Sequence, residues 1–405
     1  MSQLEISPVE STSESASEYS SFYVWTISGA AFVYVIVAFG LSAIPSLSRL
    51  ALYASVMLLA MLILSMGKLK LSLWMLVLTL FYLYLALPAL ALSNVPIYRL
   101  STLTTVFLGT LSIGIALQNR MLSYKALTYG AIAAAIINVV AIFAGVETSS
   151  HDVEAIGRYS GLMGNANALA ISMALAAFLI WLYPERFSRQ VRALGIFLVL
   201  YGMYITGSIK GVLMAMALFA LVFMNHLVKL SMVRILAYLS AAAAAVLALY
   251  GGLTAIAAKY STQIVAIDRI LTAFAGENAS INARLSMIDF GLKLWEKAPV
   301  FGYGLNQFAT LSKTGSYAHN NYIELAVSGG IIALIFFYAL YAIIACNALK
   351  QSKDFCIRLL LLVATLFMID TAAVSFLDKG IMCMVGVLLA VSSEEKTEES
   401  DRYQT

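Results

Sequence analysis

The chain has 405 residues, of which 61% are hydrophobic and only 11% are charged, with a formal net charge of +4. A soluble domain would carry about a quarter charged residues, so the composition excludes a soluble protein and indicates an integral membrane protein. The three cysteines are too few and too scattered to indicate a disulfide framework. No nucleic-acid partner is expected.

Apolar segments of membrane-spanning length follow one another along the chain, since a transmembrane helix needs about 20 mostly apolar residues. Residues 1–22 and 392–405 are polar and acidic and predict two disordered cytoplasmic tails. Between them, residues 23–391 predict one all-α polytopic membrane domain with about 12 transmembrane helices. The expected spans are Tyr23–Ile44, Leu50–Met66, Leu71–Leu92, Thr102–Leu117, Ala126–Val146, Ala166–Tyr183, Ala193–Thr206, Val212–Asn225, Ile235–Ala257, Asn321–Ala345, Leu359–Phe376 and Ile381–Val391.

The distribution of basic residues predicts the orientation of these spans. With the N-terminus inside, the inner loops hold twelve Lys and Arg, and the short outer loops hold five, namely Arg49, Arg99, Arg158, Lys210 and Lys379. Because cytoplasmic loops are enriched in basic residues, residues 258–320 are predicted to form one long periplasmic loop. Within it, Leu285–Trp295 and Ile264–Phe274 predict amphipathic helices that lie in the membrane interface or cover the bundle as a lid.

Three outer segments each carry a cation. Gly157–Asn167 holds Arg158, Thr206–Gly211 holds Lys210, and the long loop holds Arg284. Glycines let the backbone approach an anion closely, while Arg offers phosphate a planar bidentate fork and Lys a compact charge. Any one of these cations could instead anchor the membrane edge by snorkelling. Together they indicate an anion site on the outer face.

His319 ends the long loop immediately before an apolar helix, and Asn320 and Asn321 after it are suited to cap that helix. A neutral imidazole near pH 7 is a good general base for a hydroxyl, although a lone histidine at a helix start is often only a structural hydrogen-bonding group. The sequence contains no Asp-x-Asp pair in the outer segments and no Walker-type glycine loop. We therefore expect neither a metal-held nucleotide sugar nor ATP use, and a lipid diphosphate fits as donor.

Four segments together resemble the O-antigen ligase and polymerase superfamily of bacterial membrane glycosyltransferases. Gly157–Gly161 with Asn165-Ala166-Asn167 is similar to the Arg-x-x-Gly and Asn-Pro-Asn pattern of the superfamily. Thr206–Gly211 is similar to its Thr-Gly-Ser-Arg-Gly turn, with an extra Ile209 and with Lys210 in place of arginine. Its Arg followed by Pro-x-x-Gly-x-Gly resembles Arg284 with Pro299–Gly304. The ligase signature is a histidine and a polar residue, then nine intervening residues, then a glycine, and it resembles His319-Asn320 with Gly330, with Ala333 in its last place.

This resemblance implies a multi-pass enzyme of the bacterial inner membrane that needs no metal or other cofactor. It would move an undecaprenyl-diphosphate-linked glycan to an acceptor hydroxyl on the periplasmic face, with membrane lipids around it. By resemblance, His319 is the base, and Arg158 and Arg284 stabilise the leaving diphosphate. Further contacts to the diphosphate or substrate are assigned to Lys210, Asn165, Asn320 and Tyr322.

Two alternatives remain beside the ligase. A ligase transfers finished polysaccharide to lipid A-core, whereas an O-antigen or exopolysaccharide polymerase joins one glycan chain to another. A polysaccharide or lipid transporter would instead line its path with ionisable groups, and Asp370 is the strongest such group in the predicted spans.

Overall fold

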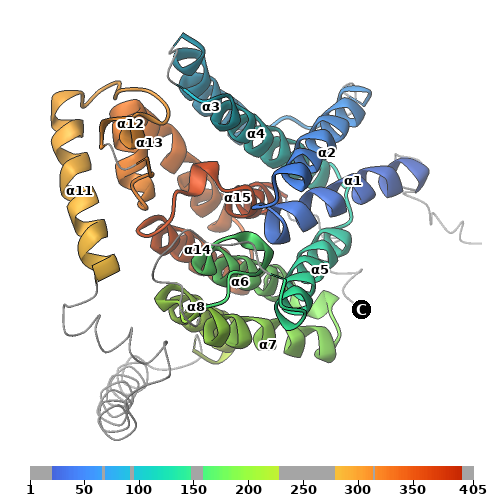
Figure 1. Ribbon diagram of the computed structural model, residues 1–405. Helices are drawn as coiled ribbons and strands as arrows, with labels where there is room; N and C mark the ends of the chain where they lie inside the picture. The colour runs from blue at the N-terminus through green and yellow to red at the C-terminus, as the bar shows by residue number, and fades with distance from the viewer. Residues whose placement is uncertain are drawn as a thin grey trace, which may run out of the picture.

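The computed structural model describes residues 21–65, 69–91, 95–146, 158–227, 279–312 and 315–394. All regular elements in these ranges are helices (Figure 1), which confirms the predicted all-α class there. The α-helices are α1 (Ser21–Gly40), α2 (Pro45–Ile63), α3 (Leu73–Ala91), α4 (Ile97–Gln118), α5 (Tyr124–Phe143), α6 (Ala166–Leu182), α7 (Arg189–Thr206), α8 (Ile209–Leu227), α11 (Ala279–Lys297), α12 (Gln307–Leu311), α13 (Asn321–Ala348), α14 (Lys353–Asp370) and α15 (Lys379–Ser392).

Within these ranges, six helices are long and apolar enough to cross a membrane, namely α1 to α5 and α13. Helices α6, α8 and α15 are apolar but shorter. Of the predicted spans, eleven coincide with helices in the described ranges, and the ninth, Ile235–Ala257, lies outside them. The helices indicate a multi-pass membrane protein, whereas the total of twelve spans, their orientation and the periplasmic placement of residues 258–320 stay predictions.

Helix α15 lies at the centre of the molecule (Figure 1). Every one of its residues is buried, and it packs against α4, α13, α1 and α6. Its sequence is almost entirely apolar between Ile381 and Val391. A helix that is apolar on all sides avoids unsatisfied polar contacts when it is enclosed, so α15 forms the axis around which the other helices pack.

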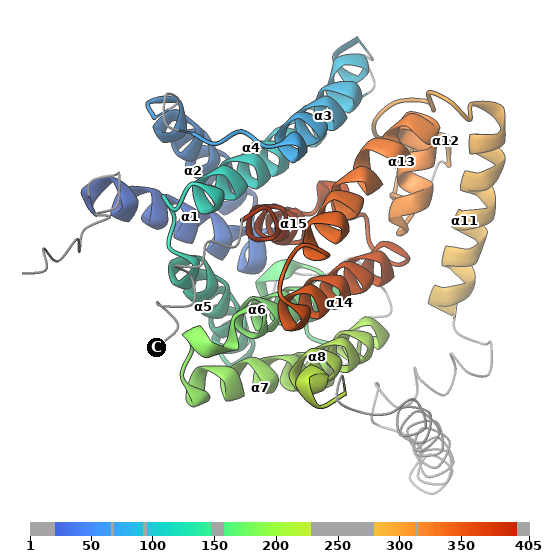
Figure 2. The same ribbon diagram turned by 180° about the vertical axis from the view of Figure 1, so that it is seen from behind.

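Helix α11 confirms that the predicted segment Leu285–Trp295 is helical, and both views place it at the outer edge of the molecule beside α13 (Figures 1 and 2). Its residues Met287, Ile288, Phe290 and Leu294 pack against a cluster around Phe308. Leu285 and Leu292, by contrast, are 58% and 41% exposed. The helix therefore presents apolar side chains both to the protein and away from it. The second predicted amphipathic segment, Ile264–Phe274, lies outside the described ranges.

Helix α13 is broken at Gly330, where the backbone adopts φ 62° and ψ −158°. Just before the break, the freed carbonyl of Val327 accepts a hydrogen bond from the amide of Tyr303 at 2.7 Å. The carbonyl of Ser328 likewise accepts one from Gly304 at 2.9 Å. The Pro299–Gly304 segment thus replaces hydrogen bonds that the interrupted helix cannot make, as buried backbone groups require.

The glycines at this junction are required by close backbone contact. A Cβ atom on Gly330 would lie 2.2 Å from the carbonyl oxygen of Val300, and one on Gly302 would lie 2.6 Å from that of Val327. Both glycines also have positive φ, which only glycine adopts without strain. The glycines of two separate sequence motifs therefore fit together at one junction, which joins the loop before α12 to the middle of α13.

Candidate functional site

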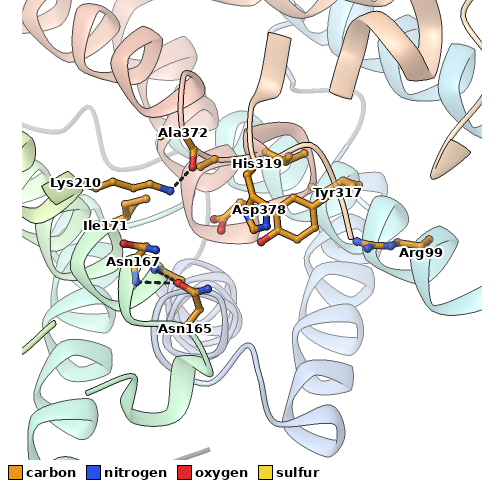
Figure 3. A pocket seen from close by; sticks show the side chains of 13 residues that line it. Arg99, Asn165, Asn167, Ile171, Lys210, Tyr317, His319, Ala372 and Asp378 are labelled. Atoms are coloured by element: carbon orange, nitrogen blue, oxygen red, sulfur yellow. Dashed lines mark hydrogen bonds between the residues drawn. The ribbon is translucent and has the colours of Figure 1, made fainter. Parts of the chain in front are cut away.

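A pocket of about 190 Å³ opens between the beginnings of several helices (Figure 3). Part of its wall is apolar and comes from the Ala372–Val374 turn. Its polar lining comes from Arg99, Asn165, Asn167, Lys210, Tyr317, His319 and Asp378. It therefore brings together three residues that were predicted as site residues, His319, Lys210 and Asn165, although more than 150 residues separate Asn165 from His319.

The pocket lies at the N-terminal ends of five of the described helices. Arg99 is in the first turn of α4 and Lys210 in that of α8. Asn165 caps α6, Asp378 caps α15, and His319 directly precedes the cap of α13. The first amide groups of a helix carry partial positive charge and attract anions. The packing thus builds an environment that favours an anionic ligand.

His319 is held in a left-handed backbone conformation with φ 53°, which is uncommon for a residue other than glycine. Its Nε2 atom lies 3.3 Å from Ser316 Oγ, and its ring packs against Tyr317 with the centroids 4.3 Å apart. Asn320 caps α13 by accepting a hydrogen bond from the amide of Ile323 at 3.1 Å. The sharp turn before this cap directs the imidazole into the pocket.

Asn320 and Tyr322, both predicted to contact substrate, lie outside the pocket lining and join α13 to α14. Asn320 Nδ2 donates to the carbonyl of Thr371 at 3.1 Å, and Asn320 is buried. The Tyr322 hydroxyl donates to the carbonyl of Phe367 at 3.1 Å, and its ring stacks on Tyr338. These contacts position the start of α13, and with it His319.

Arg158 joins the two cationic segments of the sequence. Its Nε donates to the carbonyl of Thr206 at 2.8 Å, and its Nη2 donates to Asn167 Oδ1 at 3.3 Å. The same Asn167 oxygen accepts a hydrogen bond from Ser208 Oγ at 2.7 Å. Asn165 caps α6 through the amide of Asn167 at 2.8 Å. Asn167 therefore ties Arg158 and the Thr206–Gly211 turn to the pocket wall.

Lys210 occupies the wall opposite Arg99, before the apolar run that begins at Val212 (Figure 3). Its Nζ donates to the carbonyl of Ala372. The pKa of Lys210 is lowered to about 7, mainly by burial and also by the positive charges of Arg284 and Arg158, while Asp378 opposes them. Although Arg158 and Arg284 do not line the pocket, their charges act on an ammonium group that does. The three predicted cations therefore form one electrostatic group.

Sequence reasoning missed Asp378 and Asn167, and it used Arg99 only to orient the spans. Asp378 accepts a hydrogen bond from the amide of Ile381 at 2.9 Å, and its position before an apolar run was a recognisable cap signal. Burial raises the pKa of the Asp378 carboxyl, although its backbone hydrogen bonds and the nearby Lys379 and Lys210 oppose that effect. Asp378 is thus the acidic group of the pocket.

A comparison with known protein families finds a match to the part of the chain that runs from α7 into α13. A family model described as O-antigen ligase matches residues 194–338. This O-antigen ligase segment runs from α7 into α13 and contains Lys210, Arg284 and His319.

The family match confirms the resemblance drawn from the sequence motifs. It supports a membrane glycosyltransferase of the O-antigen ligase or polymerase type. Arg158 and Asn165 precede the O-antigen ligase segment, but the pocket and the Arg158 hydrogen bonds connect them to it. The chain matches none of the curated proteins with which it was compared.

Proposed function

We propose that the chain is a periplasm-facing O-antigen ligase, which transfers a glycan from undecaprenyl diphosphate to a hydroxyl of lipid A-core. One observation carries the proposal. His319, a potential base, shares a pocket with Lys210, whose ammonium group interacts electrostatically with Arg158 and Arg284. A base beside grouped cations suits a reaction in which a hydroxyl loses a proton while an anionic group departs.

In the proposed reaction, His319 accepts the proton of the acceptor hydroxyl. The hydroxyl oxygen then bonds to the anomeric carbon of the donor sugar, and the bond from that carbon to the diphosphate oxygen breaks. Negative charge develops on the leaving undecaprenyl diphosphate, where Arg158, Arg284 and Lys210 stabilise it. Such preorganised stabilisation of developing charge is often the largest catalytic contribution. The proposed step uses neither a metal nor another cofactor.

The volume of the pocket limits how much of the substrate it can enclose. Its volume is about 190 Å³, whereas pockets that enclose a drug-sized ligand have volumes of roughly 300–1,000 Å³. We therefore assign to the pocket only the diphosphate and the donor and acceptor groups nearest the reacting atoms. The polyprenyl chain and the remaining glycan extend outside it, toward the membrane and the periplasm respectively.

The polymerase is the second candidate, because the family match supports either type. The spacing from His319 to Gly330 favours the ligase. In the structure this spacing covers the part of α13 that lies before its break, from the turn that carries His319 to Gly330. The transporter receives less support, since the Asp370 carboxylate at the end of α14 already accepts hydrogen bonds from Ser375 and Tyr338.

Gene deletion followed by analysis of cellular glycans tests the proposal. For a ligase we expect lipid A to lose all polymer while lipid-linked polymer persists, and for a polymerase we expect single-repeat products on lipid A. Plasmid-borne wild type should restore the polymer, whereas Arg158→Ala at equal membrane abundance should not. Restoration by Arg158→Ala would contradict the assigned site.

Cysteine labelling tests the proposed orientation, in a background where the three native cysteines are replaced by serine. Gly315→Cys lies in the predicted periplasmic loop and should react with an impermeant maleimide added to intact cells. Ser352→Cys, at the start of α14, should react only after the membrane is opened. The reverse pattern would place the pocket on the cytoplasmic side and contradict a periplasmic reaction.

A further inference from the structure

Arg99 approaches the pocket from a different side than Lys210. Figure 3 shows it beside Tyr317, with His319 between it and Lys210. It belongs to the first turn of α4, whereas Lys210 begins α8. The pocket therefore has a cationic group on each side of His319.

The polar atoms of Arg99 are not fully used within the protein. The side chain is half-buried, and its guanidinium carbon lies 5.2 Å from the centre of the Tyr98 ring. Its Nε atom is buried and has no hydrogen-bond partner among the described residues. A buried donor without a partner is rare in folded proteins, so Arg99 is not held by a full set of protein hydrogen bonds where it lines the pocket.

The electrostatic neighbours of Arg99 also differ from those of Lys210. The main charge effects on Lys210 come from Arg284, Arg158 and Asp378, whereas Arg99 acts on the buried carboxylate of Glu324. Glu324 already accepts a hydrogen bond from the amide of Ala318 at 2.8 Å. No ion pair joins Arg99 to Glu324 in the part of the chain that the structure describes. Arg99 therefore acts on Glu324 from a distance without a direct ion pair, while its side chain lines the pocket.

We propose that Arg99 forms a second anion subsite, which binds an acidic group of the acceptor glycan on the opposite side of His319 from the donor diphosphate. This inference rests on the proposed transferase function. The guanidinium fork matches the two oxygens of a carboxylate or phosphate. An acceptor held by such a group would bring a neighbouring hydroxyl to His319 while the diphosphate occupies the Lys210 side. The subsite therefore selects glycans that carry a uronate or a sugar phosphate next to the reacting hydroxyl.

Binding measurements on the full-length protein in lipid nanodiscs test this subsite. Farnesyl diphosphate serves as the donor probe and is kept at saturation. Glucuronate and glucose 6-phosphate are then titrated calorimetrically, with glucose as the neutral control, so that the two acids distinguish carboxylate from phosphate. We expect at least one acid to bind more tightly than glucose in the wild type.

Arg99→Gln should weaken the binding of that acid by about 10- to 100-fold, as expected for the loss of a charged hydrogen bond. The same variant should bind farnesyl diphosphate with the affinity of the wild type. Arg99→Lys should fall between the two, because it keeps the charge but loses the fork. Arg49→Gln is the matched control, since Arg49 is an exposed arginine at the start of α2 that does not line the pocket. It should change neither affinity.

Three results would overturn the proposal. Equal binding of the acids and glucose to the wild type would show that no acidic subsite exists. Weaker farnesyl diphosphate binding in Arg99→Gln would assign Arg99 to the donor. A lower melting temperature with unchanged ligand affinities would make Arg99 a partner of Glu324 alone. Failure of the wild type to bind farnesyl diphosphate would instead refute the proposed function, while the comparison of acid binding between wild type and Arg99→Gln would still decide the subsite.

Discussion

Lys210→Arg should abolish a specific pH dependence of donor binding. Burial and two neighbouring arginines lower the pKa of Lys210 to about 7, so about half of the free protein carries a charged Lys210 at neutral pH. A bound diphosphate favours the charged ammonium and raises its pKa again. Binding above pH 7 therefore takes up a proton, and donor affinity must fall as the pH rises.

The magnitude follows from this linkage. If the diphosphate binds only to the protonated form, the apparent Kd rises about tenfold for each pH unit above 7. Arginine stays protonated throughout this range, so the Kd of Lys210→Arg should stay nearly constant. The arginine of this variant should also fit the site, because arginine stands at this place in the motif that Thr206–Gly211 resembles. The variant should thus bind the donor more tightly than the wild type at pH 8.5.

Titration of farnesyl diphosphate into nanodisc-embedded protein between pH 6.5 and 8.5 measures this effect. The ionisation of the ligand affects both proteins alike, so the ratio of the two Kd values isolates the effect of Lys210. A ratio that stays constant with pH would refute the reasoning. It would mean that Lys210 is fully charged at neutral pH or does not meet the diphosphate.

Three further outcomes are expected. His319→Gln should insert normally but lose about 10²–10⁴-fold in transfer rate, because an amide cannot accept the proton. The rate is measured with a lipid-linked donor, and near-normal turnover would mean that His319 only positions the substrate. Arg158→Lys and Arg284→Lys should both remain impaired in the same assay, because lysine cannot replace the planar fork of a guanidinium group. Normal rates in both variants would show that only their charge matters. Gly330→Ala should lower the melting temperature, because the added Cβ causes a backbone strain of about 1–3 kcal/mol and collides with Val300. Gly29→Ala is the control and should leave the melting temperature unchanged, because its Cβ would meet no atom within 4 Å.

Local sequence determined the helices and the position of His319. Runs of apolar residues in a membrane must form helices because the bilayer offers the backbone no other hydrogen-bond partners, and eleven of the predicted spans accordingly coincide with helices in the described ranges. Asn320 was recognisable as a cap from its place before the apolar run. The cap in turn fixed His319 at the start of α13. These features depend on neighbours in the chain and could be predicted without a fold.

Tertiary packing decided which polar residues meet. Asn320 and Tyr322 follow His319 directly, yet contacts with α14 take them out of the pocket lining. Arg99 and Asp378 lie far from His319 in sequence, yet the packing of α4 and α15 brings both to its pocket. Motif spacing identifies residues that share a function, but the direction of each side chain depends on how the helices pack. The amino-acid sequence alone therefore predicted the cations and the base, whereas only the packed bundle placed a cation on each side of His319.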